Sequence, residues 1–192
     1  IGTVPSLRKV AEGGEYKHTT IGERGEQIQL ATYGELFSIT RQAIINDDLE
    51  AFTRIPRTLG RAAARTVGDL VFSILTDNPT MSDGKAVFHA DHKNLAGSGT
   101  AITAANVSKA RAAMRKQKDG EATLNIRPSF LLTPVEKVDT AAVLMASEAD
   151  PDQSNSRVRN LATVNGALEV IADARLDAAS ATAWYLASDP NS

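Results

Sequence analysis

The stretch NDDLEAFTRIPRTLGRAAARTVGDLVFSILTDN, residues 46–78, decides the fold expected for this chain. Its apolar residues recur at intervals of three, four or seven positions, which places them on one face of an α-helix. About thirty helical residues give a rod roughly 45 Å long, whereas the average helix has only about 11 residues. We therefore expect a long helix over residues 47–76. Its apolar face consists of Leu49, Phe52, Leu59, Ala63, Val67, Leu70 and Ile74.

Both ends of this expected helix carry recognisable signals. At the start, Asp47 or Asp48 can accept hydrogen bonds from the free N–H groups of the first turn. At the end, Pro79 lacks an N–H group and disfavours helical geometry in the residue before it. Pro56 lies inside the helix, where proline costs about 3 kcal/mol and usually bends the axis. Either a second helix begins at Pro56 or one helix bends there, and we expect the single bent helix.

Four arginines follow the same helical spacing on the face opposite to the apolar one. One interpretation is a solvated face, because arginine is a good helix former. The other is that the guanidinium groups meet acidic groups of a neighbouring subunit or a polyanion. The candidates for such an interface are Arg54, Arg57, Arg61 and Arg65.

The composition is ordinary for a globular protein and argues against several classes. The 192 residues are 42% hydrophobic and 23% charged, which is enough apolar mass for one or two cores. A formal net charge of −2 argues against a dedicated nucleic-acid binder, which usually has a strong basic excess. The chain has no cysteine, which excludes disulfides and thiolate sites and suits a reducing compartment. No run approaches the roughly 18 to 20 apolar residues of a membrane span.

The residues before the long helix predict a hairpin. Residues 1–14 give no clear element, whereas residues 15–40 alternate in short stretches around the polar loop IGERGE. The arms carry few large apolar side chains, and a hairpin that cannot bury a face is marginal in water. We expect this hairpin to extend from the body and to lean on another surface. Its last residues are expected to form a buried strand that contains Leu36, Phe37 and Ile39.

Two further helices are expected after a loop region at residues 79–99. Thr103 can cap the first, which should run to about Lys118 and end at Asp119-Gly120, and Pro134 can open the second. In the first helix the residues expected to point inward are Val107, Ala110 and Met114. In the second, four apolar residues are expected to share one side: Val135, Val138, Ala142 and Met145. The residues expected to point outward are Lys109, Arg111, Arg115 and Lys116.

Three short strands are expected among these helices, at residues 130–133, 168–172 and 183–187, with a polar loop at 150–160. From about residue 101 the order is therefore helix, strand, helix, strand, strand. This order is typical of a compact α/β unit.

His89, Asp91 and His92 form the only cluster of side chains of the kind that bind metals. Imidazole and carboxylate groups suit zinc, iron or manganese, so a metal-dependent enzyme is the alternative hypothesis. The plainer interpretation is that these are loop residues with local hydrogen bonds. The sequence shows no phosphate-binding loop, no G-x-S-x-G motif and no cysteine nucleophile. We expect no enzymatic activity, no metal and no cofactor.

Several blocks of the chain are distinctive together. They are LATYGELFSITRQAIINDDLEAFTRIPRTLGRAAARTVGDLVFSIL, FHADHKNL, ARAAMRKQKD, LNIRPSFLLTP and LDAASATAWYLASDP. In this order they resemble the major capsid protein of Mu-like phages and prophages, and the resemblance spans nearly the whole chain from about Val4. It implies an α+β fold, the tailed-phage major capsid fold. Its parts are an extended hairpin called the E-loop, a peripheral domain with a long spine helix, and an axial domain of α/β character.

Carried onto this sequence, the resemblance implies four parts. They are an N-terminal segment at 1–14, an E-loop-like hairpin at 15–40, a peripheral domain with the spine helix at 41–100, and an axial-type domain at 101–192. It also implies an arm before the chain and further strands after it, so we expect a capsid subunit truncated at both ends.

The resemblance further implies a structural role rather than catalysis. Copies of the chain would form the hexamers and pentamers of an icosahedral phage or prophage head, in contact with packaged DNA without sequence preference. A scaffold or protease would act during assembly in the bacterial cytoplasm, the finished protein would lie in the virion, and no membrane would be involved.

Overall fold

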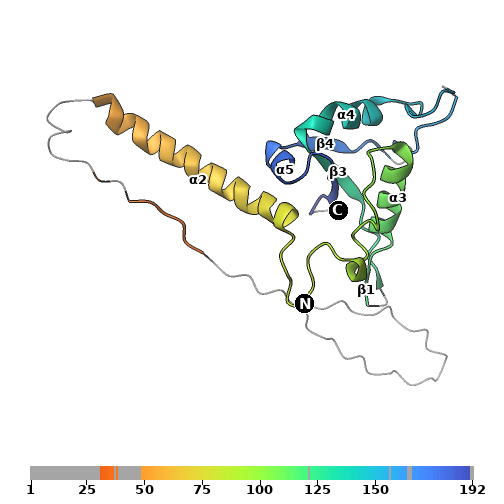
Figure 1. The fold of residues 1–192 in the computed structure, drawn as a ribbon, viewed down its shortest axis with the longest axis horizontal. Coiled ribbons are helices and arrows are strands. Elements are labelled where there is room, and N and C mark those ends of the chain that lie inside the picture. Colours follow the sequence, from red (N-terminus) through yellow and green to blue (C-terminus); the bar gives the residue numbers. More distant parts are fainter. Residues whose placement is uncertain are drawn as a thin grey trace, which may run out of the picture.

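A long helix and a compact body make up the described structure (Figure 1). The helix, α2, spans Leu49–Asp77, and all later elements belong to the body. This mixture of helix and sheet agrees with the expected α+β class. Residues 1–14 and most of the predicted hairpin at 15–40 lie outside the described residues. The computed structural model describes residues 31–36, 38, 49–120, 122–155, 157–163 and 166–190, with the backbone alone for residues 49–53.

The prediction of one long helix is confirmed. α2 has 29 residues, and Pro56 lies inside it, so no second helix begins there. The helix ends at Asp77 as expected, because Asn78 adopts a positive φ of 47° and Pro79 follows. The Asn78 side chain then fastens the following loop: its Oδ1 accepts a hydrogen bond from the Phe88 N–H at 2.7 Å, and its Nδ2 donates to the Phe88 carbonyl at 3.1 Å.

The body is built on a three-stranded sheet with the order β4-β3-β5. The central strand β3, Pro128–Thr133, pairs in parallel with β4, Glu169–Ala172, and antiparallel with β5, Tyr185–Ser188. A parallel pair requires a crossover connection, which here contains the 3-10 turn η2, Val135–Lys137, and the helix α4, Val138–Ala146. The three strands lie within two residues of their predicted bounds, so these predictions are confirmed.

Several shorter elements complete the body. The predicted helix after Thr103 is α3, which ends at Arg115 rather than near Lys118. Asp119 and Gly120, expected to end that helix, instead belong to a small hairpin: Asp119 pairs with Ala122, and Gly120 lies in the turn with a positive φ of 61°. The sequence did not predict this hairpin or α5. These elements are α3, Ala104–Arg115; η1, Ala90–His92; β1, Lys118–Asp119; β2, Ala122–Thr123; and α5, Ala174–Ala179.

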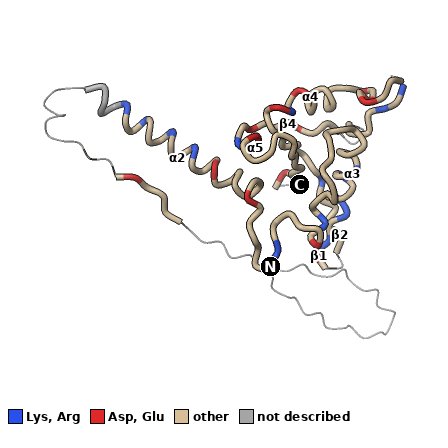
Figure 2. Tube along the Cα trace, in the orientation of Figure 1, with Lys and Arg blue, Asp and Glu red and all other residues tan. Residues whose placement is uncertain are grey.

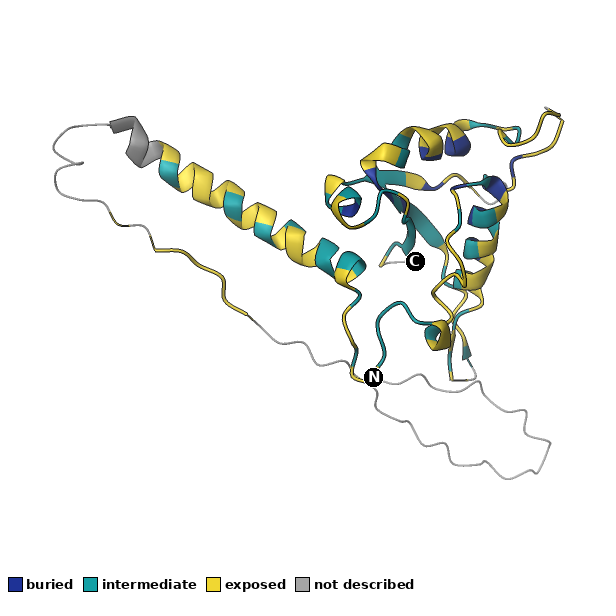
Figure 3. Ribbon diagram, viewed as in Figure 1, coloured by how far each residue is buried: buried dark blue, intermediate teal, exposed yellow. Residues whose placement is uncertain are grey.

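The core of the body lies where α3 and α4 pack on β3 and β4 (Figure 3). Thr103 caps α3 as predicted, since its hydroxyl accepts a hydrogen bond from the Asn106 N–H at 3.2 Å. Trp184 packs against the core and donates from Nε1 to the Thr100 carbonyl at 2.8 Å. The core residues are Ile102, Ala104, Val107, Leu131, Ala141, Leu144, Met145, Ala162 and Leu168.

The prediction that Arg111 points outward is wrong. The residue is only 7% exposed, and its Nη2 donates a hydrogen bond to the Gly166 carbonyl, which a distant loop brings over α3. Burial lowers the pKa of the guanidinium, because leaving water disfavours the charged form. Val107 is fully buried, as expected, and Arg115 is exposed.

The prediction that Val135, Val138, Ala142 and Met145 share one side of the helix after Pro134 is also partly wrong. Met145 is buried, whereas Val135 is 48% exposed and Ala142 is exposed. The reason is that Val135 lies in the 3-10 turn η2, whose three-residue period breaks the phase with α4. The buried residues of α4 are Ala141, Leu144 and Met145.

The buried strand predicted before the long helix is not found among the described residues of this segment, 31–36 and 38. Leu36 is fully exposed, and residues 31–36 have no regular secondary structure. Phe37 and Ile39 lie outside the described residues. No described side chain covers Leu36, so it adds nothing to the core formed by the described residues.

Candidate functional site

The apolar face of α2 is exposed over most of its described length (Figure 3). We call Leu59, Ala63, Val67, Leu70 and Ile74 the apolar stripe. Val67 is 63% exposed and Ile74 48%, and Val71 beside them is 57% exposed. The side chains of Leu49 and Phe52, which the sequence assigned to the same face, lie outside the described residues. From Leu59 to Ile74 the stripe is about 22 Å long at 1.5 Å per residue. A contiguous apolar surface of this kind marks a contact site in a soluble protein.

The arginine column, defined as Arg54, Arg57, Arg61 and Arg65, is exposed. Within the part of the chain that the structure describes, no ion pair involves Arg57, Arg61 or Arg65. These three follow each other at four-residue intervals, where like charges on a helix repel by a few tenths of a kcal/mol per pair. The column is therefore a concentrated positive surface on a chain whose total charge is slightly negative.

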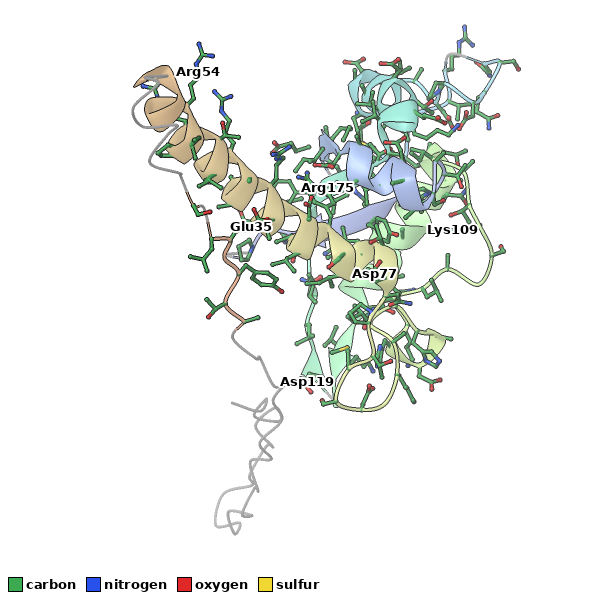
Figure 4. All side chains as sticks on the ribbon, turned by 60° about the vertical axis from the view of Figure 1, so that its left-hand side comes forward. Glu35, Arg54, Asp77, Lys109, Asp119 and Arg175 are labelled. Atoms are coloured by element: carbon green, nitrogen blue, oxygen red, sulfur yellow. The ribbon has the colours of Figure 1, made fainter. Side chains whose placement is uncertain are left out.

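The arginine column continues the face by which α2 contacts the body. Arg61 and Arg65 are followed at helical spacing by Gly68 and Phe72, and these two residues contact Arg175 of α5. Figure 2 shows the basic residues along the upper edge of α2. Figure 4 shows Arg54 near the start of the helix, at the end away from the body. The apolar stripe lies on the opposite side of the helix. α2 thus presents two different surfaces, one apolar and one basic.

The His89–Asp91–His92 cluster is a hydrogen-bonded loop. The His89 Nδ1 accepts a hydrogen bond from the Asp91 N–H at 3.2 Å. This hydrogen bond caps the start of η1. The carboxylate of Asp91 pairs with Lys85 Nζ at 2.5 Å, and Asn94 Oδ1 accepts from the His89 N–H at 3.0 Å. Among the described residues, no group of three histidine or acidic side chains is placed to hold a metal ion. This geometry agrees with the plainer interpretation, and nothing in it favours a metal-dependent enzyme.

His92 has an acceptor at each ring nitrogen. Its Nε2 lies 2.7 Å from Asp83 Oδ2, and its Nδ1 lies 3.1 Å from the Val87 carbonyl. Only the protonated imidazolium can donate to both. The hydrogen bond with Asp83 therefore raises the pKa of His92 above 6.5, and the same bond lowers the pKa of Asp83.

This arrangement predicts a pH-dependent contribution to stability. Because the pKa of His92 is raised in the folded chain, its contribution is complete below about 6.5, the ordinary value, and is lost as the pH rises through the folded value. We expect His92→Gln to be less stable than the parent chain at pH 5.5 and nearly equal at pH 8.5. Urea unfolding of both proteins at the two pH values measures this. An equal difference at both pH values would contradict the assignment.

The sequence did not reveal the residues that hold α2 against the body. They include Gly68, Asp69 and Phe72 on α2 and Arg175 on α5. A signal for α5 was present, because Asp173 precedes it and its Oδ1 accepts a hydrogen bond from the Arg175 N–H at 2.9 Å, as N-cap residues do. Six residues, however, are too few for a helical period to be recognised.

Comparison with known proteins gives one clear result. Residues 24–192 match the model of a family described as phage capsid protein. Comparisons with curated proteins and with solved structures give no match. Among the described residues, no helix is both long and apolar enough to span a membrane. The family match covers α2 and the whole body. The chain therefore belongs to the phage capsid protein family, which implies a structural, non-enzymatic role in the multi-subunit shell of a virion.

Proposed function

We propose that this chain is the major head subunit of a Mu-like phage or prophage, and that its copies assemble into the icosahedral, DNA-containing shell. In this proposal α2 is the spine helix of a peripheral domain within residues 41–100, and the α/β body from residue 101 is the axial-type domain. Residues 15–40 act as the E-loop. Hexamers and pentamers of the chain form the shell, with a scaffold or protease as partners during assembly in the bacterial cytoplasm.

The exposed apolar stripe on α2 carries this proposal. Helices in proteins gain most of their stability from packing an apolar face, yet this stripe has no cover from the described parts of its own chain. Burying a valine or leucine side chain contributes about 1.5–3 kcal/mol, so a covered stripe is worth several such contributions. In a shell, a neighbouring copy would pack against the apolar stripe of each subunit and bury it.

Residues 15–40 of the next copy are the cover that we propose. Of this segment the structure describes residues 31–36 and 38, where Tyr33 is 62% exposed and Leu36 is fully exposed. Two surfaces that are both exposed within one chain can bury each other between chains. Such a contact joins different surfaces of two copies, so it is heterologous and can repeat around a ring.

Assembly of the purified full-length protein tests the proposed function. We expect sedimentation to show large particles as the concentration rises, and negative-stain electron microscopy to show closed shells. The same preparation is inspected for stoichiometric metal and for a thermal shift with zinc or manganese, which the alternative enzyme requires. A protein that stays monomeric at high concentration and forms no shells would overturn the proposal.

We also propose that the arginine column faces the packaged DNA. Reversing two of its charges, in Arg57→Glu with Arg61→Glu, should lower the DNA content of each shell while shells still form. In binding assays with DNA, the slope of log affinity against log salt should fall by about two units, because each phosphate contact releases about one counterion. The ratio of absorbance at 260 and 280 nm of purified shells measures the filling.

The matched control makes the same charge change elsewhere. Arg115→Glu with Lys116→Glu reverses two exposed cations at the C-terminal end of α3, and filling should then stay at the parent level. Unchanged filling in the α2 variant would reject a role in DNA contact. Loss of the shells themselves would instead assign the column to a contact with acidic groups of a neighbouring copy.

A further inference from the structure

One arginine joins α2 to the body. The guanidinium of Arg175 forms a hydrogen bond from Nε to Asp69 Oδ1 at 2.5 Å, and its Nη1 lies 3.0 Å from Asp173 Oδ2. Its Cζ lies 5.6 Å from the centre of the Phe72 ring, within reach of a cation–π contact. Asp69 and Asp173 thus bind two edges of the planar guanidinium, and the Phe72 ring lies against one of its faces. These contacts fix its orientation. Figure 4 shows Arg175 between α5 and α2.

Arg175 can contact α2 in this way at only one turn of the described helix, the one that contains Gly68 and Asp69. A Cβ atom at Gly68 would lie 3.0 Å from Arg175 Nη2, so any larger residue would push the guanidinium away. One turn toward the start of the helix, the same face carries Arg65, which repels another cation. Asp69 is therefore the acidic partner of Arg175 in this turn of α2. The preceding turn, which carries Arg65, disfavours a contact of Arg175 closer to the start of the helix.

A second contact supports α2 just below the first. Tyr185 of β5 donates from Oη to the Leu75 carbonyl at 3.1 Å, and its ring lies 5.3 Å from that of Phe88. From Leu75 to Gly68 the two supports span only about 10 Å of a helix that is roughly 43 Å long. The first support is also open to water, because the side chain of Asp69 is 64% exposed. Removing it should loosen the angle of α2 without unfolding the body.

We propose that Arg175 is the positioning residue that fixes the angle between α2 and the body, with Gly68 and Asp69 as its receptor on the helix. This inference rests on the proposed function, because the angle matters only where α2 meets neighbouring copies. The arginine sets where the apolar stripe and the arginine column point, and so which direction the next subunit takes.

The angle is measured on the subunit in solution. The chain has no cysteine, so Gly60→Cys on α2 and Ala112→Cys on α3 give two unique sites for spin labels. A Cβ atom at Gly60 meets no other atom within 4 Å, and Ala112 is exposed, so neither label disturbs packing. A swing of about 15° at Leu75 moves Gly60, roughly 22 Å away along the helix, by about 6 Å. Double electron–electron resonance resolves such a change.

Arg175→Met keeps the length of the side chain and removes its charge. We expect the distance distribution between the labels to shift or broaden by several ångströms, and Asp69→Asn to give the same change. The double variant should change the distance distribution no more than either single variant does, because both substitutions remove the same interaction. Arg127→Met removes an exposed cation from the body and should leave the distribution unchanged. A distribution in Arg175→Met that equals that of the parent chain would overturn the proposal.

Shell formation by the same variants completes the test. We expect Arg175→Met to give a lower yield of closed shells and more irregular particles than the parent chain, and Arg127→Met to match it. Normal shells from Arg175→Met would reject the inference but not the proposed function. A complete lack of shells in the parent chain would reject the proposed function, while the label distances would still decide whether Arg175 fixes the angle.

Discussion

Replacing Val67 with glutamate should abolish shell assembly while the isolated subunit keeps its fold. Val67 lies in the middle of the apolar stripe and is 63% exposed, so a carboxylate there is solvated in the free subunit. Exposed substitutions of this kind usually change stability by less than about 0.5 kcal/mol. In a shell the same carboxylate would be covered without a partner, at a cost of several kcal/mol for each copy. Electron microscopy and sedimentation of Val67→Glu measure the assembly, and circular dichroism measures the fold.

The matched control is Val143→Glu, which places the same charge at an exposed valine on α4. Val143 is 56% exposed, so the two variants differ in location and hardly in exposure. We expect Val143→Glu to form shells as the parent chain does. Shells from Val67→Glu at the parent yield would show that the apolar stripe is not an interface.

Replacing Asn160 with alanine should destabilise the body by about 3 kcal/mol. The residue is fully buried, and its Nδ2 donates to the Leu144 carbonyl at 2.5 Å and the Ser147 carbonyl at 2.9 Å. These carbonyls lie at the C-terminal end of α4, where the helix itself supplies no donors. Its Oδ1 accepts from the Ala162 N–H at 2.9 Å. Alanine would leave all three groups without these partners, at two sites that are buried and one, the Ser147 carbonyl, that is part-buried. Urea unfolding measures the loss.

Asn155→Ala is the corresponding control in the same loop. The Asn155 Oδ1 accepts a hydrogen bond from the Arg157 N–H at 3.0 Å, but the residue is exposed and water can replace the side chain. We expect a loss below about 1 kcal/mol for this variant. Equal losses in both variants would show that the network around Asn160 does not hold the end of α4.

The sequence predicted the elements whose signal is contained in a long local pattern. α2 was clear because its apolar residues keep one phase over the whole helix, and its end was clear because the apolar period stops before Asn78-Pro79, where proline disfavours helical geometry in the residue before it. The three strands were found because short apolar runs lie between polar loops. Thr103 was identified as a cap because the residue type and its position before a helix are sufficient.

The features that the sequence did not predict depend on distant residues. Arg111 is buried and donates to the carbonyl of Gly166, which is 55 residues away in the sequence, so no local pattern in α3 predicts that contact. The exposure of the apolar stripe also has no local signal, because an amphipathic helix has the same pattern whether its partner is in the same chain or in another. The same holds for Asp69, whose role appears only when α5 brings Arg175 to it.

The two contacts that hold α2 also determine the order in which the chain can fold. Asp69 and Arg175 are 106 residues apart, and Leu75 and Tyr185 are 110 apart. A helix forms within about a microsecond, whereas closing such long loops is slow and must await the rest of the body. During synthesis α2 is therefore complete long before its supports exist, with its apolar stripe open to other chains. Only a chain in which β5 has paired holds α2 in place, so under the proposed function correct contacts between copies require that β5 has already joined the sheet.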